Sequence, residues 1–514
     1  MKNTVLVLLS IFSLMSLIQA QTIDLKKVIK SADDQFKIQN YYGAEKLYIQ
    51  AYDQDSLNKE VNFKLGVCKY EMKDYLAAEQ LFIKSSSAVS LEIFRYKAAI
   101  AHASQKFKKA INYYNAYKII KGEKDLTNEE VNALIAKSIY AEDAISSPRN
   151  VSIVNVGATI NTAFDEYVPL ISADEELMVF TSRRPGNTGG NMDPNGRYFE
   201  DIYSTKNTGN GWQKPTPLNT SINTATNDAC AGLSADGNLL LFFRTNADLI
   251  SGDLYECRMG LDDWEKPTKL PSAINSNAIE SSASITVTEK VLYFSSDRDG
   301  GFGGKDIYKV ERLPNGSWGK AQNLGPTINT AYDEDAPFIH SDGKTLYFSS
   351  TGHQNMGGYD IFKTIKSETG EWTNPENVGY PINTVTDDIF FVLAANGRTG
   401  YYSSSQDGGY GGQDIYKVNL KDQYEKLHVL KGIVYNESGE IPLSAKITLI
   451  ENETASIQGI YKSKDGSGKF IMLVQPDKTY SYVIQADGYH PKTEELMFDI
   501  KKSEPMKFTL APKN

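Results

Sequence analysis

The sequence contains few of the residues on which disulfide frameworks and metal sites depend. Its 514 residues include three cysteines and five histidines. Cys230 and Cys257 fall within one repeat and could pair, but an odd count without metal-type spacing provides no disulfide framework. No histidine has a second histidine or a carboxylate at ligand spacing; the five are His102, His340, His353, His428 and His490. The sequence therefore favours neither a disulfide-stabilised fold nor a histidine or cysteine metal site.

Signatures of hydrolytic chemistry are also missing. There is no Gly-x-Ser-x-Gly nucleophile elbow, and the glycines of "DGGFGGKDIY" precede no helix that could bind a nucleotide. A sialidase-like site would need converging arginines and paired acids, and we expect that the arginines do not recur from repeat to repeat. The sequence predicts a protein that is not an enzyme.

Positive charge and long apolar runs are both limited. The net charge of −10 and the pI near 5.3 argue against a nucleic-acid partner, because phosphate binding needs a dense basic surface. Residues 1–20, "MKNTVLVLLSIFSLMSLIQA", have the pattern of a signal peptide cleaved after Ala20, without a cysteine for lipid attachment. No later stretch predicts a transmembrane segment. We expect an exported, soluble chain that begins at Gln21.

Residues 21–147 have helical periodicity and an internal repeat. Aligning "NYYGAEKLYIQA" with "KDYLAAEQLFIKS" superposes residues 34 positions apart, such as Ala44 with Ala78 and Tyr48 with Phe82. This period is that of the tetratricopeptide repeat, in which a small residue lets two helices touch. "QKFKKAINYYNAY" is a third copy around Ala110, and Thr127 with Glu130 predicts a capping box that opens a final helix.

Residues 148–422 have a longer period, which predicts the blades of a β-propeller. One marker is Ile-Asn-Thr/Ser, which begins at Ile160, Ile222, Ile274, Ile328 and Ile382. A second marker, Asp followed by an apolar and an aromatic residue, begins at Asp201, Asp253, Asp306, Asp360 and Asp414. All four tryptophans share one repeat position, and they are Trp212, Trp264, Trp318 and Trp372. Five markers with four tryptophans predict five blades, the last completed by a strand at 151–156 that closes the ring.

Residues 426–514 alternate apolar and polar residues between turn signals. This pattern predicts a small antiparallel β-sandwich of about seven strands. The predicted fold is thus multidomain, with a helical tetratricopeptide solenoid, a five-bladed β-propeller and a β-sandwich.

This domain order, with "DGKTLYFSS…GGYDIF…W" blades and a "KGIVY…ADGY" sandwich, resembles the PorE-type periplasmic proteins of the Bacteroidota type IX secretion system. The resemblance implies PD40 or WD40-like blades, a carboxypeptidase-regulatory-like sandwich without peptidase activity, and a role in secretion or gliding. It also implies a periplasmic location near the outer membrane, with envelope proteins such as a PorP-type outer-membrane protein as partners. The OmpA-like domain usual in that family has no counterpart up to Asn514, so we expect no direct peptidoglycan binding.

A carboxylate recurs shortly after each Ile-Asn-Thr/Ser marker, at the expected start of each innermost strand. The five residues are Glu166, Asp228, Glu280, Glu334 and Asp388. They could form a negative ring at one mouth of the central channel that receives a basic peptide or a Ca²⁺ ion, because clustered like charges need a cation among them. Each could instead accept backbone N–H bonds or pair locally. No other cofactor is expected.

Two functions remain open from the sequence. The first is a non-enzymatic scaffold that binds envelope proteins, and the second is an exported propeller that binds or cleaves glycans. The shared position of the tryptophans indicates a structural role rather than exposed sugar-stacking platforms, which favours the scaffold.

Overall fold

The computed structural model describes residues 24–85, 90–122, 125–406, 408–421, 427–498 and 505–513. The predicted signal peptide, residues 1–20, lies outside these ranges. Contacts divide the chain into two compact units, one with residues up to 135 together with 193–197, and one with 136–192 and 198–514. None of the helices in the described ranges has the length and apolarity that crossing a membrane requires.

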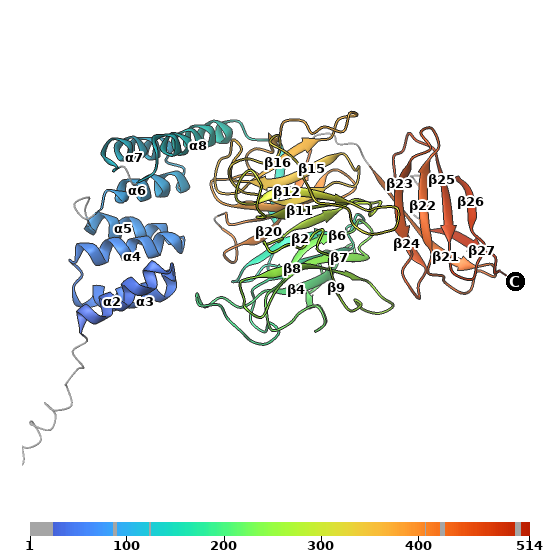
Figure 1. The fold of residues 1–514 in the computed structure, drawn as a ribbon, viewed down its shortest axis with the longest axis horizontal. Helices are drawn as coiled ribbons and strands as arrows, with labels where there is room; N and C mark the ends of the chain where they lie inside the picture. Colours follow the sequence, from blue (N-terminus) through green and yellow to red (C-terminus); the bar gives the residue numbers. More distant parts are fainter. Residues whose placement is uncertain are drawn as a thin grey trace, which may run out of the picture. The chain divides into compact units, whose positions relative to one another are not determined.

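The first unit is built from helices that contact one another in consecutive pairs, drawn in blue to teal in Figure 1. Ala44, Ala78 and Ala110 are fully buried, as the repeat predicts. A Cβ added to Gly66 would lie 2.7 Å from the Phe82 ring, so this glycine allows two helices to approach closely. The helices are α2 (Leu25–Lys37), α3 (Tyr41–Gln54), α4 (Lys59–Glu71), α5 (Tyr75–Ser85), α6 (Glu92–Ala103), α7 (Phe107–Ile120) and α8 (Asn128–Ser146).

Helix α8 begins with the predicted capping box. The Thr127 backbone N–H donates to Glu130 Oε2 at 2.6 Å, and the Glu130 N–H donates to Thr127 Oγ1 at 3.2 Å. The division between the two units falls inside this helix, between residues 135 and 136, and the helix itself ends at Ser146. Within the second unit Lys137 Nζ donates to the carbonyl oxygen of Gly357 at 2.7 Å, which ties the later part of α8 to the β-structure.

The repeat region of the second unit, from β1 to β20, forms five four-stranded antiparallel sheets, called blades 1 to 5 below. Blade 1 has β2 (Glu166–Ile171), β3 (Leu177–Ser182), β4 (Asp201–Lys206) and β5 (Thr216–Pro217). Blade 2 has β6 (Asp228–Leu233), β7 (Leu239–Thr245), β8 (Gly252–Arg258) and β9 (Thr268–Lys269). Blade 3 has β10 (Ala283–Ile285), β11 (Val291–Ser296), β12 (Asp306–Glu311) and β13 (Gln322–Asn323). Blade 4 has β14 (Glu334–Ile339), β15 (Thr345–Ser350), β16 (Asp360–Ile365) and β17 (Glu376–Asn377).

Blade 5 takes its outer strand from the other end of the repeat region. It combines β18 (Asp388–Leu393), β19 (Thr399–Ser404) and β20 (Asp414–Leu420) with β1 (Val151–Asn155), which pairs antiparallel with β20. The predicted pairing of an N-terminal strand with the last blade is confirmed. The first strands of the blades contact one another in the order β2, β6, β10, β14 and β18, and β18 contacts β2. The fold is therefore propeller-like, with its sheets arranged in a ring.

The C-terminal strands form a sandwich of two sheets, shown in orange to red in Figure 1. One sheet orders β24 (Lys469–Val474), β21 (His428–Asn436) and β27 (Met506–Leu510), and the other orders β23 (Ile457–Lys462), β22 (Lys446–Glu451), β25 (Tyr480–Gln485) and β26 (Lys492–Leu496). The prediction of an entirely antiparallel sandwich is wrong, because β21 and β27 pair in parallel. β27 returns to β21 after the four-stranded sheet has intervened, and such a crossover permits parallel pairing.

The sandwich packs against hairpin turns of the blades within the second unit. Ala173 and Ala395, which lie in the turns after β2 and β18, belong to the same apolar cluster as the sandwich core. The Leu427 N–H donates to the carbonyl oxygen of Ala395 at 3.2 Å, and Lys431 pairs with Asp174 at 3.2 Å. One end of the ring is thus covered at these turns.

Candidate functional site

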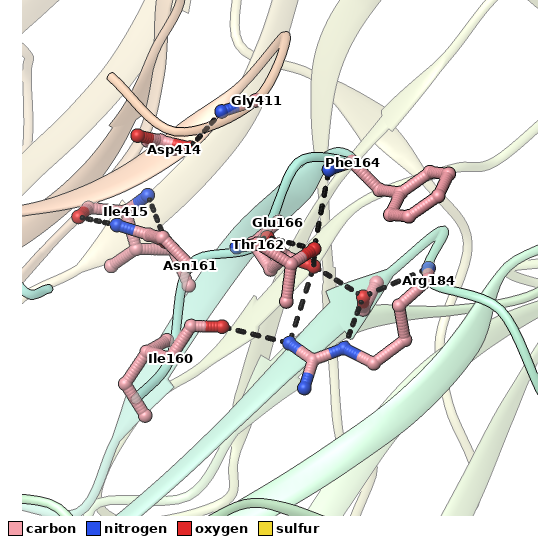
Figure 2. A network of polar contacts seen from close by, with 10 residues as sticks. Ile160, Asn161, Thr162, Phe164, Glu166, Arg184, Gly411, Asp414 and Ile415 are labelled. Carbon is pink, nitrogen blue, oxygen red and sulfur yellow. Dashed lines mark hydrogen bonds and ion pairs between the residues drawn. The ribbon is translucent and has the colours of Figure 1, made fainter. Parts of the chain in front are cut away.

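The Ile-Asn-Thr/Ser segments hold neighbouring strands together, as Figure 2 shows for the junction of blades 5 and 1. Ile160 is fully buried. Asn161 Nδ2 donates to the carbonyl oxygen of Ile415 at 2.9 Å, and the Ile415 N–H donates back to Asn161 Oδ1 at 2.9 Å. The same two bonds join Asn223 to Ile202, Asn275 to Leu254, Asn329 to Ile307 and Asn383 to Ile361. Asn161 is thus the acceptor for the Ile415 N–H, and it shares the Ile415 carbonyl oxygen with the Val156 N–H.

The next residue of the segment binds the repeated carboxylate. The Thr162 N–H donates to Glu166 Oε2 at 2.6 Å, and Thr162 Oγ1 donates to Glu166 Oε1 at 2.9 Å (Figure 2). The equivalent pairs are Thr224 with Asp228, Ser276 with Glu280, Thr330 with Glu334, and Thr384 with Asp388. Each carboxylate therefore closes a tight turn before the innermost strand, which explains the spacing of four residues.

In four blades, a serine hydroxyl at the end of the second strand also donates a hydrogen bond to the carboxylate of the same blade. Ser182 Oγ donates to Glu166 Oε1 at 2.6 Å. Ser296, Ser350 and Ser404 do the same for Glu280, Glu334 and Asp388. In blade 2, Arg244 occupies the position of this serine, and its Nε donates to Asp228 at 2.6 Å.

Arginines recur at these carboxylates in three blades, contrary to our expectation from the sequence. Arg184 Nη2 lies 3.2 Å from Glu166, and Arg298 Nη2 lies 2.9 Å from Glu280. Arg184 also donates to the carbonyl oxygen of Ile160 at 2.8 Å (Figure 2). The signal was present as an arginine two residues after the serine in "TSRR" and "SSDR", but Arg244 lies two positions earlier and disguises the pattern.

The electrostatic setting of the carboxylates differs among the blades. Burial raises the pKa of Glu166 and of Asp228 above the ordinary values, while bonds from Ser182 or Arg244 act against the rise. Burial raises the pKa of Asp388 well above its usual range, and the negative charge of Asp360 adds to that rise. Asp388 is bonded by Ser404 and Thr384, which are both uncharged.

The predicted acidic ring is not an exposed ring. The five carboxylates do lie at or just before the start of the innermost strands, but each side chain is fully buried. The geometry is that of the alternative interpretation, in which each carboxylate accepts local hydrogen bonds, because the turn and the second strand enclose it. Among the described residues, no three His, Cys, Asp or Glu side chains are arranged to hold a metal ion.

The space inside the ring is narrow and mainly apolar. Val168, Leu233, Ala283, Phe338 and Phe390 contribute to its lining, and its cavity has a volume of about 30 Å³. The innermost strands β2, β14 and β18 contain bulges at Val168, Ala336 and Phe390, which have positive φ. A cavity of this volume holds about two water molecules.

A second buried polar group was missed by the sequence reasoning. Lys305 Nζ donates to Asp335 Oδ2 at 2.7 Å, and Ser295 Oγ donates to Asp335 Oδ1 at 2.7 Å. Burial tends to raise the pKa of Asp335, but the ammonium of Lys305 holds it below the ordinary value. The sequence did mark Asp335 as unusual, because the residue that follows the repeated carboxylate is acidic only in blade 4.

The cysteines are free. Cys230 and Cys257 are both buried and unpaired with each other, and Cys257 Sγ donates to the carbonyl oxygen of Glu265 at 2.8 Å. The possible disulfide between them is therefore absent.

No protein-family model and no curated protein sequence matches the chain. An α-L-arabinofuranosidase from Lactobacillus brevis is 12% identical and has a TM-score of 0.34, with 52% of this chain and 92% of that chain covered. An endo-arabinase from Bacteroides thetaiotaomicron VPI-5482 is 12% identical and has a TM-score of 0.35, with 53% and 98% covered. The WD40 repeats of RRP9 are 8% identical and have a TM-score of 0.30, with 53% and 99% covered. Likeness at this level carries no argument about activity.

Proposed function

We propose that the protein is a non-enzymatic scaffold of the periplasm, in which a tetratricopeptide solenoid, a five-bladed β-propeller and a carboxypeptidase-regulatory-like sandwich each offer a surface to an envelope protein. The setting would be the type IX secretion or gliding machinery, with outer-membrane proteins such as a PorP-type protein as partners. The signal peptide would deliver the chain, and its partners would keep it at the outer membrane.

The observation that carries the proposal is the use of the repeated polar residues inside the fold. Glu166 and its four equivalents are carboxyl groups that recur in every blade, and each is buried and bonded by donors of its own blade. A group in this position holds strands in place and is closed to a substrate. Repetition of the same network in all five blades supports a structural role, since a catalytic site requires one distinctive set of groups.

The helical part supports a scaffold as well. The close approach at Gly66 and the burial of Ala44, Ala78 and Ala110 are what the tetratricopeptide pattern predicts. Stacked helical repeats of that class present an extended binding surface rather than an active site.

The alternative is a propeller that binds or cleaves glycans. Glycoside hydrolysis uses two carboxyl groups that flank the bond in an open cleft, roughly 5 to 10 Å apart. The repeated carboxylates do not meet that requirement, because they are buried, so we place the scaffold first.

Capture of partners from an envelope extract tests the proposal. Tagged protein from Gln21 to Asn514 would be used as bait in extract from a Bacteroidota bacterium. We expect recovery of a type IX secretion or gliding protein of the outer membrane, and reciprocal recovery when that protein is the bait. Bait unfolded by heat is the control for non-specific capture.

The same preparation would be incubated with arabinan, xylan and other polysaccharides. Release of reducing sugar, or retardation in gels that contain the polysaccharide, would support the glycan alternative. Recovery no greater than that of the unfolded bait would overturn the scaffold proposal.

A further inference from the structure

Four blades carry a tryptophan that packs against the preceding blade. Each of these tryptophans bridges to the residue that follows the third strand of its own blade, and the pairs are Trp212 with Asn207, Trp264 with Met259, Trp318 with Arg312, and Trp372 with Lys366. Trp212 packs edge-on against Tyr401 of blade 5, and Trp372 packs edge-on against Tyr293 of blade 3, each with ring centroids 6.1 Å apart. The indole thus fills the space between adjacent blades.

Blade 5 has a valine where the other blades have tryptophan. The residue of blade 5 six positions after its Asp marker is Leu420, which is equivalent to Asn207 and Lys366. The partner of Leu420 is Val151, supplied by the closing strand β1. The substitution follows from the way the ring closes, because the outer strand of blade 5 comes from a different part of the chain.

A cavity lies where the missing indole would be. Its volume is about 120 Å³, and Val151, Leu420, Tyr347 and Phe391 contribute to its lining. Tyr347 occupies the same register position in blade 4 as Tyr293 in blade 3. Cavities of about 150 Å³ with apolar walls bind benzene, so this one is of the right size for an aromatic ring.

The rim of the cavity carries two cations and one carboxylate. Arg149, Lys363 and Glu376 belong to its lining, and Arg149 and Glu376 are exposed, so the cavity reaches solvent. The walls near Tyr347, Phe391 and Leu420 are buried. Lys363 faces the negative charges of Glu376 and Asp342, whereas the exposed guanidinium of Arg149 is complementary to an aromatic group that has a negative charge beside it.

We propose that this cavity, the seam pocket, receives an aromatic side chain of a partner protein, best a tryptophan, whose neighbouring acidic residue pairs with Arg149. The occupant would complete for blade 5 the packing that the chain's own tryptophans provide elsewhere. The inference rests on the proposed scaffold function to the extent that the occupant belongs to another protein.

Binding of short peptides to the purified protein from Gln21 to Asn514 tests the seam pocket. The probe is N-acetyl-Glu-Trp-Glu-amide, measured by isothermal titration calorimetry, with N-acetyl-Lys-Trp-Lys-amide as the charge-reversed peptide. We expect the acidic peptide to bind at least five-fold more tightly than the basic one. That preference should disappear in Arg149→Gln.

Filling the pocket from within should block the peptide. Val151→Trp places the missing indole in the seam, and we expect at least ten-fold weaker binding. Val154→Trp makes the same change on the same strand at a side chain that is 57% exposed, and should bind like the wild type. Leu420→Phe is a second filling variant in case Val151→Trp does not fold, which circular dichroism would report.

Three results would overturn the proposal. These are no binding to the wild type, unchanged binding to both filling variants, and tighter binding of free indole-3-acetate than of the peptide, which would indicate a small metabolite. Since purified components are used, failure of the envelope capture would leave this test unaffected.

Discussion

Blades 1 to 3 and blades 4 and 5 hold the same buried carboxylate in different electrostatic surroundings. In blades 1 to 3 a guanidinium pairs with it, from Arg184, Arg244 or Arg298. In blade 4 the ring of His353 takes the place of the arginine at the carbonyl oxygen of Ile328, and in blade 5 the position of Arg184 is occupied by Gln406. The threonine and serine bonds are therefore sufficient to build the turn, and the cation adds charge compensation.

Removing the cation from blade 2 should have the largest effect. Arg244→Met leaves Asp228 buried without a charged partner, and breaking a buried pair in this way costs about 3 kcal/mol. Arg244→Ser is the matched control, since serine is the residue at this position in the other four blades, and should cost clearly less. Urea unfolding followed by tryptophan fluorescence measures both. Equal losses for the two variants would mean that the hydroxyl cannot replace the guanidinium.

Asp360 in blade 4 should make stability depend on pH. Burial raises the pKa of Asp360 to about 7. A raised pKa makes the folded protein retain the proton that the unfolded chain releases, so the stabilising contribution is complete below about pH 4 and is lost as pH rises through about 7. We expect a fall on the order of 3 kcal/mol in the free energy of unfolding over this window.

Urea midpoints between pH 4 and pH 8 measure that fall. Asp360→Asn should flatten the curve, whereas Asp306→Asn, at the same repeat position in blade 3, should leave the slope in place. If Asp360→Asn leaves the slope unchanged, the Asp360 carboxyl group is not the source of the pH dependence.

Neutralising the carboxylates one at a time should separate the two groups of blades. Glu166→Gln leaves the Arg184 charge without its partner and should cost about 1–2 kcal/mol. Asp388→Asn keeps a hydrogen-bonding group of similar shape where no cation is paired with it, and should be nearly neutral at pH 7. Thermal unfolding at equal protein concentration compares them, and a larger loss for Asp388→Asn would reverse the comparison.

Adding the missing cation to blade 5 should give the smallest effect. Gln406→Arg places a guanidinium at the position that Arg184 and Arg298 take in their blades, and should stabilise the protein at pH 7 by about 1 kcal/mol. Gln406→Lys is the control for charge without the forked geometry. Differential scanning calorimetry would show the gain, and a loss with both variants would mean that the junction of blades 5 and 1 has no room for a longer side chain.

The sequence predicted those features that local spacing or the count of repeats indicates. The capping box of Thr127 and Glu130 and the buried alanines of the helical repeats follow from local spacing. The pairing of β1 with the last blade follows from five repeat markers with only four tryptophans. Burial of Glu166 did not, because it depends on Ser182 and Arg184, which lie on another strand. The seam pocket combines Val151 with Tyr347 and Leu420, and no single repeat contains that combination.

Two further differences have the same origin. The parallel pairing of β27 with β21 depends on how the chain crosses between two sheets, which alternation of apolar residues cannot indicate. The recurrence of arginines was hidden because Arg244 is displaced along its strand relative to Arg184 and Arg298, although all three reach an equivalent carboxylate. Arginines at different positions of the repeat can therefore reach equivalent carboxylates in the folded blades.

The pairing of β1 with β20 has a consequence for how the protein is made. Asn155 donates to Asp414, a residue 259 positions later, so the first strand to emerge from a ribosome or a translocation channel waits for the last blade before it has a partner. Until then the ring has two open edges, which expose unpaired backbone to proteases and to other chains. A chain interrupted before Leu420 therefore keeps open sheet edges and stays accessible to proteases. Only a chain that includes Leu420 can close the ring and resist proteolysis.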